Sequence, residues 1–250
     1  MDIKEFFKEH KKVALAFSGG VDSAVLLALA TKYAKDVKAY FVKTAFQPLF
    51  ELEDAQQIAA LTGAEFEIIR LNILADVAVT ANPENRCYFC KKRIFGAIIS
   101  KAHDDGYDFI LDGTNASDDI SDRPGFAALK ELGVLSPLRD CGYTKADIRL
   151  TAEELKLPVA HKPSYACLAT RLPYGTPITQ EALEKTERNE AYLRSLGFVN
   201  FRIRYVDSSA RLELSRADFE LIFKKKDKIF SFLSKDYENV FLNLRERKDE

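Results

Sequence analysis

The fold is decided by Ser18-Gly19-Gly20-Val21-Asp22-Ser23, which joins an apolar run at residues 13–17 to an apolar helical stretch at residues 24–35. The continuous apolar run is typical of a strand buried on both faces. Adjacent glycines let the backbone turn sharply and bring its N–H groups close to a ligand. The first turn of the helix adds unpaired donors and the positive end of its dipole, which favour phosphate. We therefore expect a phosphate-binding loop, to which Ser18 and Ser23 add hydroxyl groups.

This loop is neither a Walker A loop, which requires Gly-Lys-Ser/Thr, nor the G-x-G-x-x-G dinucleotide fingerprint. It resembles the pyrophosphatase (PP) loop of the N-type ATP pyrophosphatases, which adenylate a substrate and release pyrophosphate. The resemblance implies that ATP is a cofactor and that Asp22 also serves catalysis. The residues that it assigns to ATP binding are Ser18, Gly19, Gly20, Asp22 and Ser23. It indicates the activation chemistry but not the substrate.

The pattern around the loop alternates strands and helices. Further strands are expected at residues 37–43, 65–71 and 109–112, with a fifth candidate at 134–138, and helices at 51–62, ending at Gly63, and 90–103. Buried strands separated by helices predict an α/β domain. The pattern implies a Rossmann-like parallel sheet covered by helices on both faces. The resemblance of the loop to the PP loop further implies that this sheet is of the adenine nucleotide alpha hydrolase type.

The pattern changes after residue 172. A helix is expected at 179–196, strands at 201–206 and 210–214, a second helix at 216–233 and a last strand at 239–244. The breaker-rich linker at 172–177 marks a boundary. The expected domains are an ATP pyrophosphatase domain at 1–172 and a smaller C-terminal α+β domain at 173–250. The lysine-rich run at 224–228 is expected to be a solvated helix face.

Composition limits the functional classes. The chain has 250 residues, 37 Lys plus Arg against 38 Asp plus Glu, and a formal charge of −1, which argues against a general polyanion binder. No apolar run approaches the roughly 18 residues of a membrane span. The four cysteines are too few for a disulfide scaffold, so a reducing cytoplasm is the expected setting. Three histidines argue against a His-based metal site.

A second polar string, Asp112-Gly113-Thr114-Asn115-Ala116-Ser117-Asp118, follows the expected strand at 109–112. Ligands of open parallel sheets bind at the carboxyl ends of the strands, and Mg²⁺ prefers carboxylate and phosphate oxygens. An Asx-rich turn is the alternative interpretation. Arg123 follows as a candidate for phosphate or the adenylate. Asp112, Asn115 and Asp118 are therefore expected to face the nucleotide or its Mg²⁺. The candidates for nucleotide contact are Gly113, Asn115, Asp118 and Arg123.

The cysteines allow several interpretations. Cys87-Tyr88-Phe89-Cys90 suits metal ligation, dithiol redox chemistry or chance, and His161 with Cys167 would complete a zinc site. Cys167 is flanked by Lys162 and Arg171, and nearby cations favour thiolate. A thiolate beside an adenylated carboxyl group is a competent acyl acceptor, although a buried inert cysteine is the alternative. Cys141 is expected to be an ordinary residue near a turn.

The motifs occur together in one order, and the whole chain resembles the LarE-type ATP-dependent sulfur transferases. The strings that carry this resemblance are the PP loop, Asn85-Arg86-Cys87-Tyr88-Phe89-Cys90-Lys91, Asp112-Gly113-Thr114-Asn115, Arg123-Pro124-Gly125, Ala166-Cys167-Leu168-Ala169-Thr170-Arg171 and Arg202-Ile203-Arg204-Tyr205. The resemblance implies that ATP, with Mg²⁺, adenylates a carboxylate of a pyridinium dicarboxylate mononucleotide. A cysteine sulfur then produces a thiocarboxylate for the nickel-pincer cofactor of lactate racemase. It also implies a homo-oligomer.

The family offers two sulfur sources. In single-cysteine members the cysteine surrenders its sulfur and becomes dehydroalanine, and Cys167 is the matching residue. Other members hold a [4Fe-4S] cluster on three cysteines. Here Cys87 and Cys90 accompany Cys167, and three thiolates leave one iron open, so a cluster is favoured.

The small domain is expected to bind the substrate phosphate. Arg202 and Arg204 alternate on one face of a strand, and two guanidinium groups suit a phosphate. Glu190 matches a substrate-side family residue. A solvated strand face is the alternative for the arginines. Competing functions are an ammonia-dependent amidating synthetase, a tRNA thiolase, against which the charge of −1 argues, and a nucleotide sensor with structural zinc.

Overall fold

The computed structural model describes residues 2–119 and 124–247. The chain divides into two compact units, one made of Met1–Val79 and Asn85–Lys162 and the other of Thr80–Glu84 and Pro163–Glu250. The expected boundary after residue 172 therefore falls inside the second unit. Of the described helices, none combines the length and the apolar character needed to cross a membrane.

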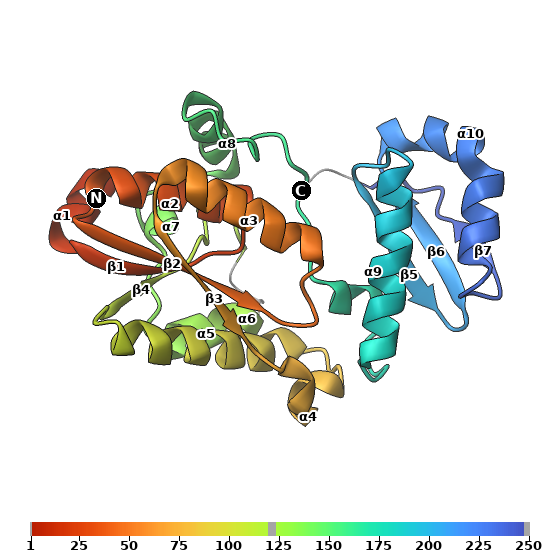
Figure 1. Cartoon of the computed structure of the whole chain (residues 1–250), viewed down its shortest axis with the longest axis horizontal. Helices are drawn as coiled ribbons and strands as arrows, with labels where there is room; N and C mark the ends of the chain where they lie inside the picture. Colours follow the sequence, from red (N-terminus) through yellow and green to blue (C-terminus); the bar gives the residue numbers. More distant parts are fainter. Residues whose placement is uncertain (1, 120–123, 248–250) are drawn as a thin grey trace. The chain divides into compact units, whose positions relative to one another are not determined.

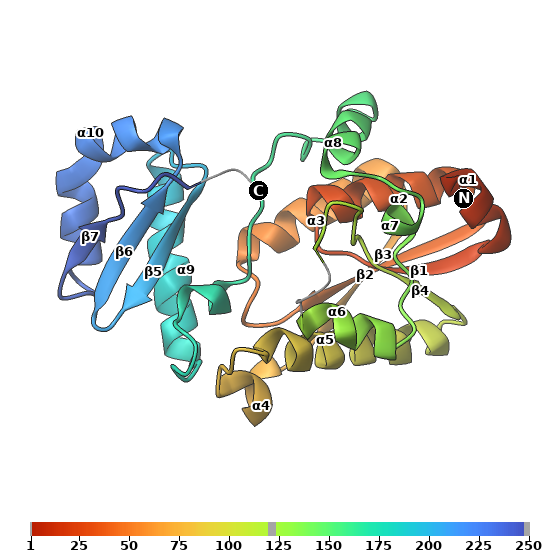
Figure 2. The same cartoon turned by 180° about the vertical axis from the view of Figure 1, so that it is seen from behind.

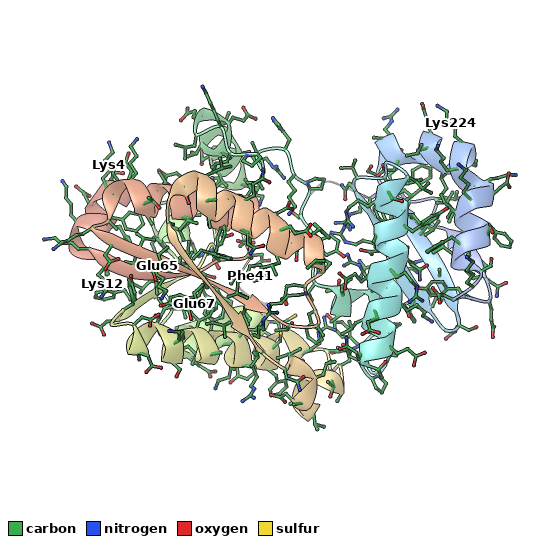
Figure 3. The ribbon with its side chains drawn as sticks, viewed as in Figure 1. Lys4, Lys12, Phe41, Glu65, Glu67 and Lys224 are labelled. Atoms are coloured by element: carbon green, nitrogen blue, oxygen red, sulfur yellow. The ribbon has the colours of Figure 1, made fainter. Side chains whose placement is uncertain are left out.

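The first unit is built on a four-stranded parallel sheet of order β3-β2-β1-β4 (Figure 1). Its strands are β1 (Lys12–Ala16), β2 (Asp36–Lys43), β3 (Glu65–Arg70) and β4 (Phe109–Leu111). Glu65 and Glu67 of β3 pair with Lys38 of β2 at 2.9 and 2.8 Å, and both glutamates are labelled in Figure 3. The parallel register confirms the α/β class predicted from the alternating pattern.

Helices cover both faces of this sheet. The first core joins the sheet to α1 (Ile3–Glu9), α2 (Val21–Tyr33), α3 (Leu49–Thr62), α7 (Pro137–Asp140) and α8 (Lys145–Glu154). The second core joins the other face to α5 (Arg86–Asp104) and α6 (Pro124–Glu131). Figure 1 shows the two layers on opposite sides of the strands. Between β3 and α5 lie the short helices η1 (Ile73–Ala75) and α4 (Val77–Thr80).

The prediction of a fifth strand at residues 134–138 is wrong. The described residues show a single parallel bridge there, between Leu111 and Leu135. Pro137 has no N–H to continue a ladder, and it stands at the start of the short helix α7. The segment therefore lies beside β4 for one residue pair and then turns away.

The second unit has a three-stranded sheet of order β5-β6-β7 (Figure 2). Strands β5 (Phe201–Val206) and β6 (Ser209–Leu214) are antiparallel, and β7 (Val240–Leu242) pairs in parallel with β6. Helices α9 (Gln180–Ser195) and α10 (Arg216–Leu233) contribute to its core. This confirms the smaller α+β domain. Lys224 on α10 is exposed, as expected of a solvated helix face (Figure 3).

Candidate functional site

The PP loop has the geometry that its glycines require. Gly19 has a φ of +76°, and a Cβ at this position would lie 3.1 Å from the Cβ of Ala55 on α3. Both facts disfavour any residue with a side chain at this position. The Ser23 hydroxyl donates to the Gly20 carbonyl at 3.0 Å and lies 3.1 Å from Ser18 Oγ. The loop thus has internal hydrogen bonds, and among the described residues no side chain caps α2 at Gly20.

The second polar string packs directly against this loop. A Cβ at Gly113 would lie 3.0 Å from the backbone nitrogen of Ser23, so glycine permits the close approach. Asn115 Nδ2 donates to Asp22 Oδ1 at 2.9 Å, which joins the two loops through their polar side chains. Asp118 accepts from the Asn115 backbone nitrogen at 3.0 Å. The structure therefore brings together the expected nucleotide residues that it describes.

Asp112 is buried and supports the second loop through hydrogen bonds, so its carboxylate does not face solvent. It is 5% exposed and accepts hydrogen bonds from Ser136 Oγ at 2.6 Å and Thr114 Oγ1 at 2.5 Å. Arg139 donates to the backbone carbonyls of Asn115 and Asp118 at 3.2 and 2.9 Å. The segment from Ser136 to Arg139 thus holds the second loop, a role that sequence reasoning missed. Arg123 lies outside the described residues.

Lys145 is a second residue that sequence reasoning missed. Its Nζ lies 2.6 Å from Asp22 Oδ2, and both side chains are partly exposed. A capping box between Thr144 and Asp147 begins α8 and places Lys145 as its first residue. The spacing Thr-x-x-Asp predicts the start of this helix from the sequence alone. The pairing of Lys145 with Asp22, 123 residues away, has no such local signal.

The expected cluster ligands belong to different units. Cys87 and Cys90 lie in the first turns of α5, in the first unit, and Cys167 precedes η2 (Leu168–Arg171) in the second. None of the four cysteines forms a disulfide within the described residues. Cys87 is exposed, and Cys90 and Cys167 are partly exposed. Within residues 2–119 and 124–247, no three His, Cys, Asp or Glu side chains form a group that could hold a metal ion.

A buried ion pair holds the segment around Cys167. Arg171, 1% exposed, contacts Glu190 Oε1 through Nε at 2.7 Å and Oε2 through Nη2 at 3.0 Å. The same guanidinium donates to the carbonyl of Ala166 at 3.0 Å and to Thr170 Oγ1 at 2.8 Å. Arg171 therefore connects helix α9 with the residues on either side of Cys167.

Glu190 is saturated by hydrogen bonds. Besides Arg171, it accepts from the Tyr165 hydroxyl at 2.6 Å and from the Ile203 nitrogen at 3.1 Å. Burial opposes ionisation, but the Arg171 charge and these hydrogen bonds outweigh it and hold the pKa of Glu190 below its usual range. Burial beside this carboxylate raises the pKa of Tyr165. The expected role of Glu190 on the substrate side stays a prediction.

The two arginines of β5 contact the Cys167 segment. Arg202, 3% exposed, donates to the carbonyls of Phe201 and Ser164 at 2.7 and 2.5 Å. Burial, with the charges of Arg171 and Arg247, lowers the pKa of Arg202 to about 10. Arg204 donates to the Thr170 carbonyl at 2.6 Å and to Glu213 at 3.0 Å. Their expected role in phosphate binding stays a prediction.

Comparison with known proteins identifies relatives. A family model described as queuosine biosynthesis protein QueC matches residues 12–93. An uncharacterised protein of Synechocystis sp. is 40% identical over 218 residues, covering 85% of this chain and 80% of the relative. A pyridinium-3,5-bisthiocarboxylic acid mononucleotide synthase of Lactiplantibacillus plantarum is 32% identical over 212 residues, covering 84% and 77%. A tRNA-specific 2-thiouridylase of Fervidobacterium nodosum is 32% identical, covering 60% and 54%.

The parallel sheet, with a glycine loop at its first strand–helix junction, and the match over residues 12–93 define a PP-loop enzyme that uses ATP. The relative from L. plantarum is matched over 77% of its length at 32% identity. The chain belongs to the family of LarE-type ATP-dependent sulfur transferases.

Proposed function

We propose that this enzyme adenylates a carboxylate of a pyridinium dicarboxylate mononucleotide and converts it to a thiocarboxylate for a nickel-pincer cofactor. The observation that carries the proposal is the similarity to the L. plantarum synthase, which covers 84% of this chain and therefore parts of both units. The proposed setting is a reducing cytoplasm, in which cysteines stay without disulfides.

The first unit would perform the activation. The PP loop and the start of α2 would receive the ATP phosphates, while Asp22 and Asp118 would hold Mg²⁺ through their carboxylates. A substrate carboxylate oxygen attacks the α-phosphorus, the bond to the bridging oxygen breaks, and diphosphate leaves with the electron pair. Lys145, now paired with Asp22 at 2.6 Å, would turn to the departing phosphates and neutralise their charge.

The second unit would supply the sulfur step. In the self-sacrificing alternative, the Cys167 thiolate attacks the carbonyl carbon of the acyl adenylate, and AMP leaves. Loss of the Cα proton of Cys167 then breaks its Cβ–Sγ bond. The thiocarboxylate then departs and dehydroalanine remains. The Arg171 contacts to the carbonyls of Ala166 and Cys167 hold this segment in place for the attack.

Three thiols fit a [4Fe-4S] cluster by donor chemistry. Cys87, Cys90 and Cys167 form no disulfide and are at least partly exposed, and three thiolates would leave one iron without a protein ligand. Such a cluster would supply a sulfide as the transferred atom and spare the protein. Cys87 and Cys90, one turn apart on α5, lie on the same side of that helix.

The substrate phosphate is proposed to bind Arg202 and Arg204, with Glu190 beside them. Register pairs Arg204 with Arg211 and Arg202 with Glu213 on one face of the sheet, so three arginines share that face with one glutamate. This excess of positive charge supports a phosphate ligand. We further propose a homo-oligomer with no nucleic-acid partner, which size-exclusion chromatography with light scattering would test.

Anaerobic purification tests the sulfur source. We expect brown wild-type protein with about four irons per chain, by three-thiolate ligation. Cys167→Ala should lose iron and thiocarboxylate formation, whereas Cys141→Ala, which changes a cysteine outside the proposed ligand set, should retain both. Colourless, iron-free wild type that loses the mass of H₂S from Cys167 on turnover would establish self-sacrifice instead. An amidation that survives Cys167→Ala would establish an ammonia-dependent synthetase, and thiolation of tRNA would establish a tRNA thiolase.

A further inference from the structure

Residues Thr80–Glu84, called the strap here, lie between α4 and α5 in sequence but belong to the second unit. The chain therefore changes from one unit to the other after Val79, after Glu84 and after Lys162. Two of these changes of unit are followed within five residues by a cysteine. Cys87 stands three residues beyond Glu84, and Cys167 stands five residues beyond Lys162.

Asn82 fixes the strap within the second unit. Its side chain is fully buried, and its Nδ2 donates to the carbonyls of Pro173 and Thr176 at 2.7 and 2.9 Å. Its own carbonyl accepts from the Gly175 nitrogen at 2.9 Å, and the Ile178 nitrogen donates to the Thr80 carbonyl at 2.8 Å. The strap is therefore hydrogen-bonded to residues 173–178, which follow η2.

The residue type at this position is specific. Asn82 has a φ of 55°, in the left-handed region, which Asn adopts more readily than other non-glycine residues. Two carbonyl oxygens face its side chain, so a neutral group with two N–H donors is required. An aspartate of the same shape has no donors, and a glycine has no side chain. Asn is thus compatible with the left-handed backbone and also supplies the two N–H donors.

We propose that Asn82 is a positioning residue for sulfur transfer, and this role rests on the proposed function, in which Cys87 and Cys90 act together with Cys167. By holding the strap, Asn82 anchors the chain that enters α5 to the unit that carries Cys167. A short, fixed tether raises the effective concentration of two groups for each other, and a longer, loose one lowers it. Releasing the strap should therefore slow every reaction that requires the cysteines of both units.

The test is the initial rate of disulfide formation between Cys167 and either Cys87 or Cys90 in the iron-free full chain. Diamide is the oxidant: it takes up the two electrons and two protons that two thiols release. Asn82→Gly keeps the left-handed backbone but deletes both donors, and Asn82→Asp keeps the shape without them. Asp207→Gly, an exposed left-handed residue with φ 53° in the turn between β5 and β6, is the matched control.

We expect both Asn82 variants to form these disulfides about tenfold more slowly, as measured by peptide mass spectrometry, because two hydrogen bonds from a buried amide are lost. Asp207→Gly should match wild type. Wild-type rates in either Asn82 variant would overturn the role of Asn82 and leave the proposed function standing. A wild-type chain that never joins Cys167 to Cys87 or Cys90 would overturn both this role and the proposed three-cysteine cluster, and would leave the self-sacrificing route to the thiocarboxylate standing. Circular dichroism melts identify any variant that fails to fold, and the remaining variant then decides.

Discussion

Replacing Glu190 by Gln should destabilise the second unit by about 3 kcal/mol, the lower end of the range for removing one partner of a buried ion pair. The side chains of Arg171 and Glu190 are 0% and 1% exposed, so water cannot replace the lost carboxylate. Each Glu190 oxygen accepts two hydrogen bonds, from Arg171 together with Ile203 or Tyr165. An amide keeps only one oxygen, so two donors would face an NH₂ group and the guanidinium would lose its countercharge.

Urea unfolding, followed by far-ultraviolet circular dichroism, measures the loss. The control is Glu131→Gln, which removes a glutamate from the exposed pair with Lys92, where the side chains are 42% and 49% exposed. A surface pair contributes about 0–1 kcal/mol, so this control should change little. We also expect Glu190→Gln to slow sulfur transfer, because Arg171 would hold the Cys167 segment less firmly.

Equal losses of stability in Glu190→Gln and Glu131→Gln would refute this reasoning. The double variant Arg171→Met with Glu190→Leu provides a second check. Replacing both charges with apolar groups of similar size should cost less than removing either one, because no buried charge is left without a partner.

Further predictions concern the loops and acid stability. Lys145→Ala should lower pyrophosphate release about tenfold or more, because one cation beside Asp22 is lost, and Lys145→Arg should restore part of it; a coupled phosphate assay measures both. Gly113→Ala should weaken ATP binding measured by calorimetry, since its Cβ would lie 3.0 Å from the Ser23 nitrogen. The lowered pKa of Glu190 means that its stabilisation is fully present above the pKa of an unfolded glutamate, about 4.3, and is lost as pH falls through the lower folded value. Urea titrations between pH 7 and 3 should show that loss in wild type and a smaller one in Glu190→Gln.

Much of the fold was predictable because local signals agree with it. Residues 216–233 were expected to be helical, and α10 has those bounds. Gly63 ends α3 in the left-handed conformation, as its position after the periodic stretch predicts. The prediction of a strand at 134–138 was wrong because apolar residues alone cannot show whether a hydrogen-bonded β-ladder continues past Pro137.

A PP loop at the first strand–helix junction follows from the residues alone, since glycines, hydroxyls and an apolar strand within a few residues specify that turn. The two classes of unit follow from the residues as well, because hydrophobic periodicity is a local property. The folded chain was needed to show that Lys145 pairs with Asp22, that Glu190 is enclosed by Arg171 and Tyr165, and that Asn82 belongs to the second unit. These contacts join residues far apart in the chain. Their partners are selected by sheet register, helix packing and burial, which no short stretch of sequence contains.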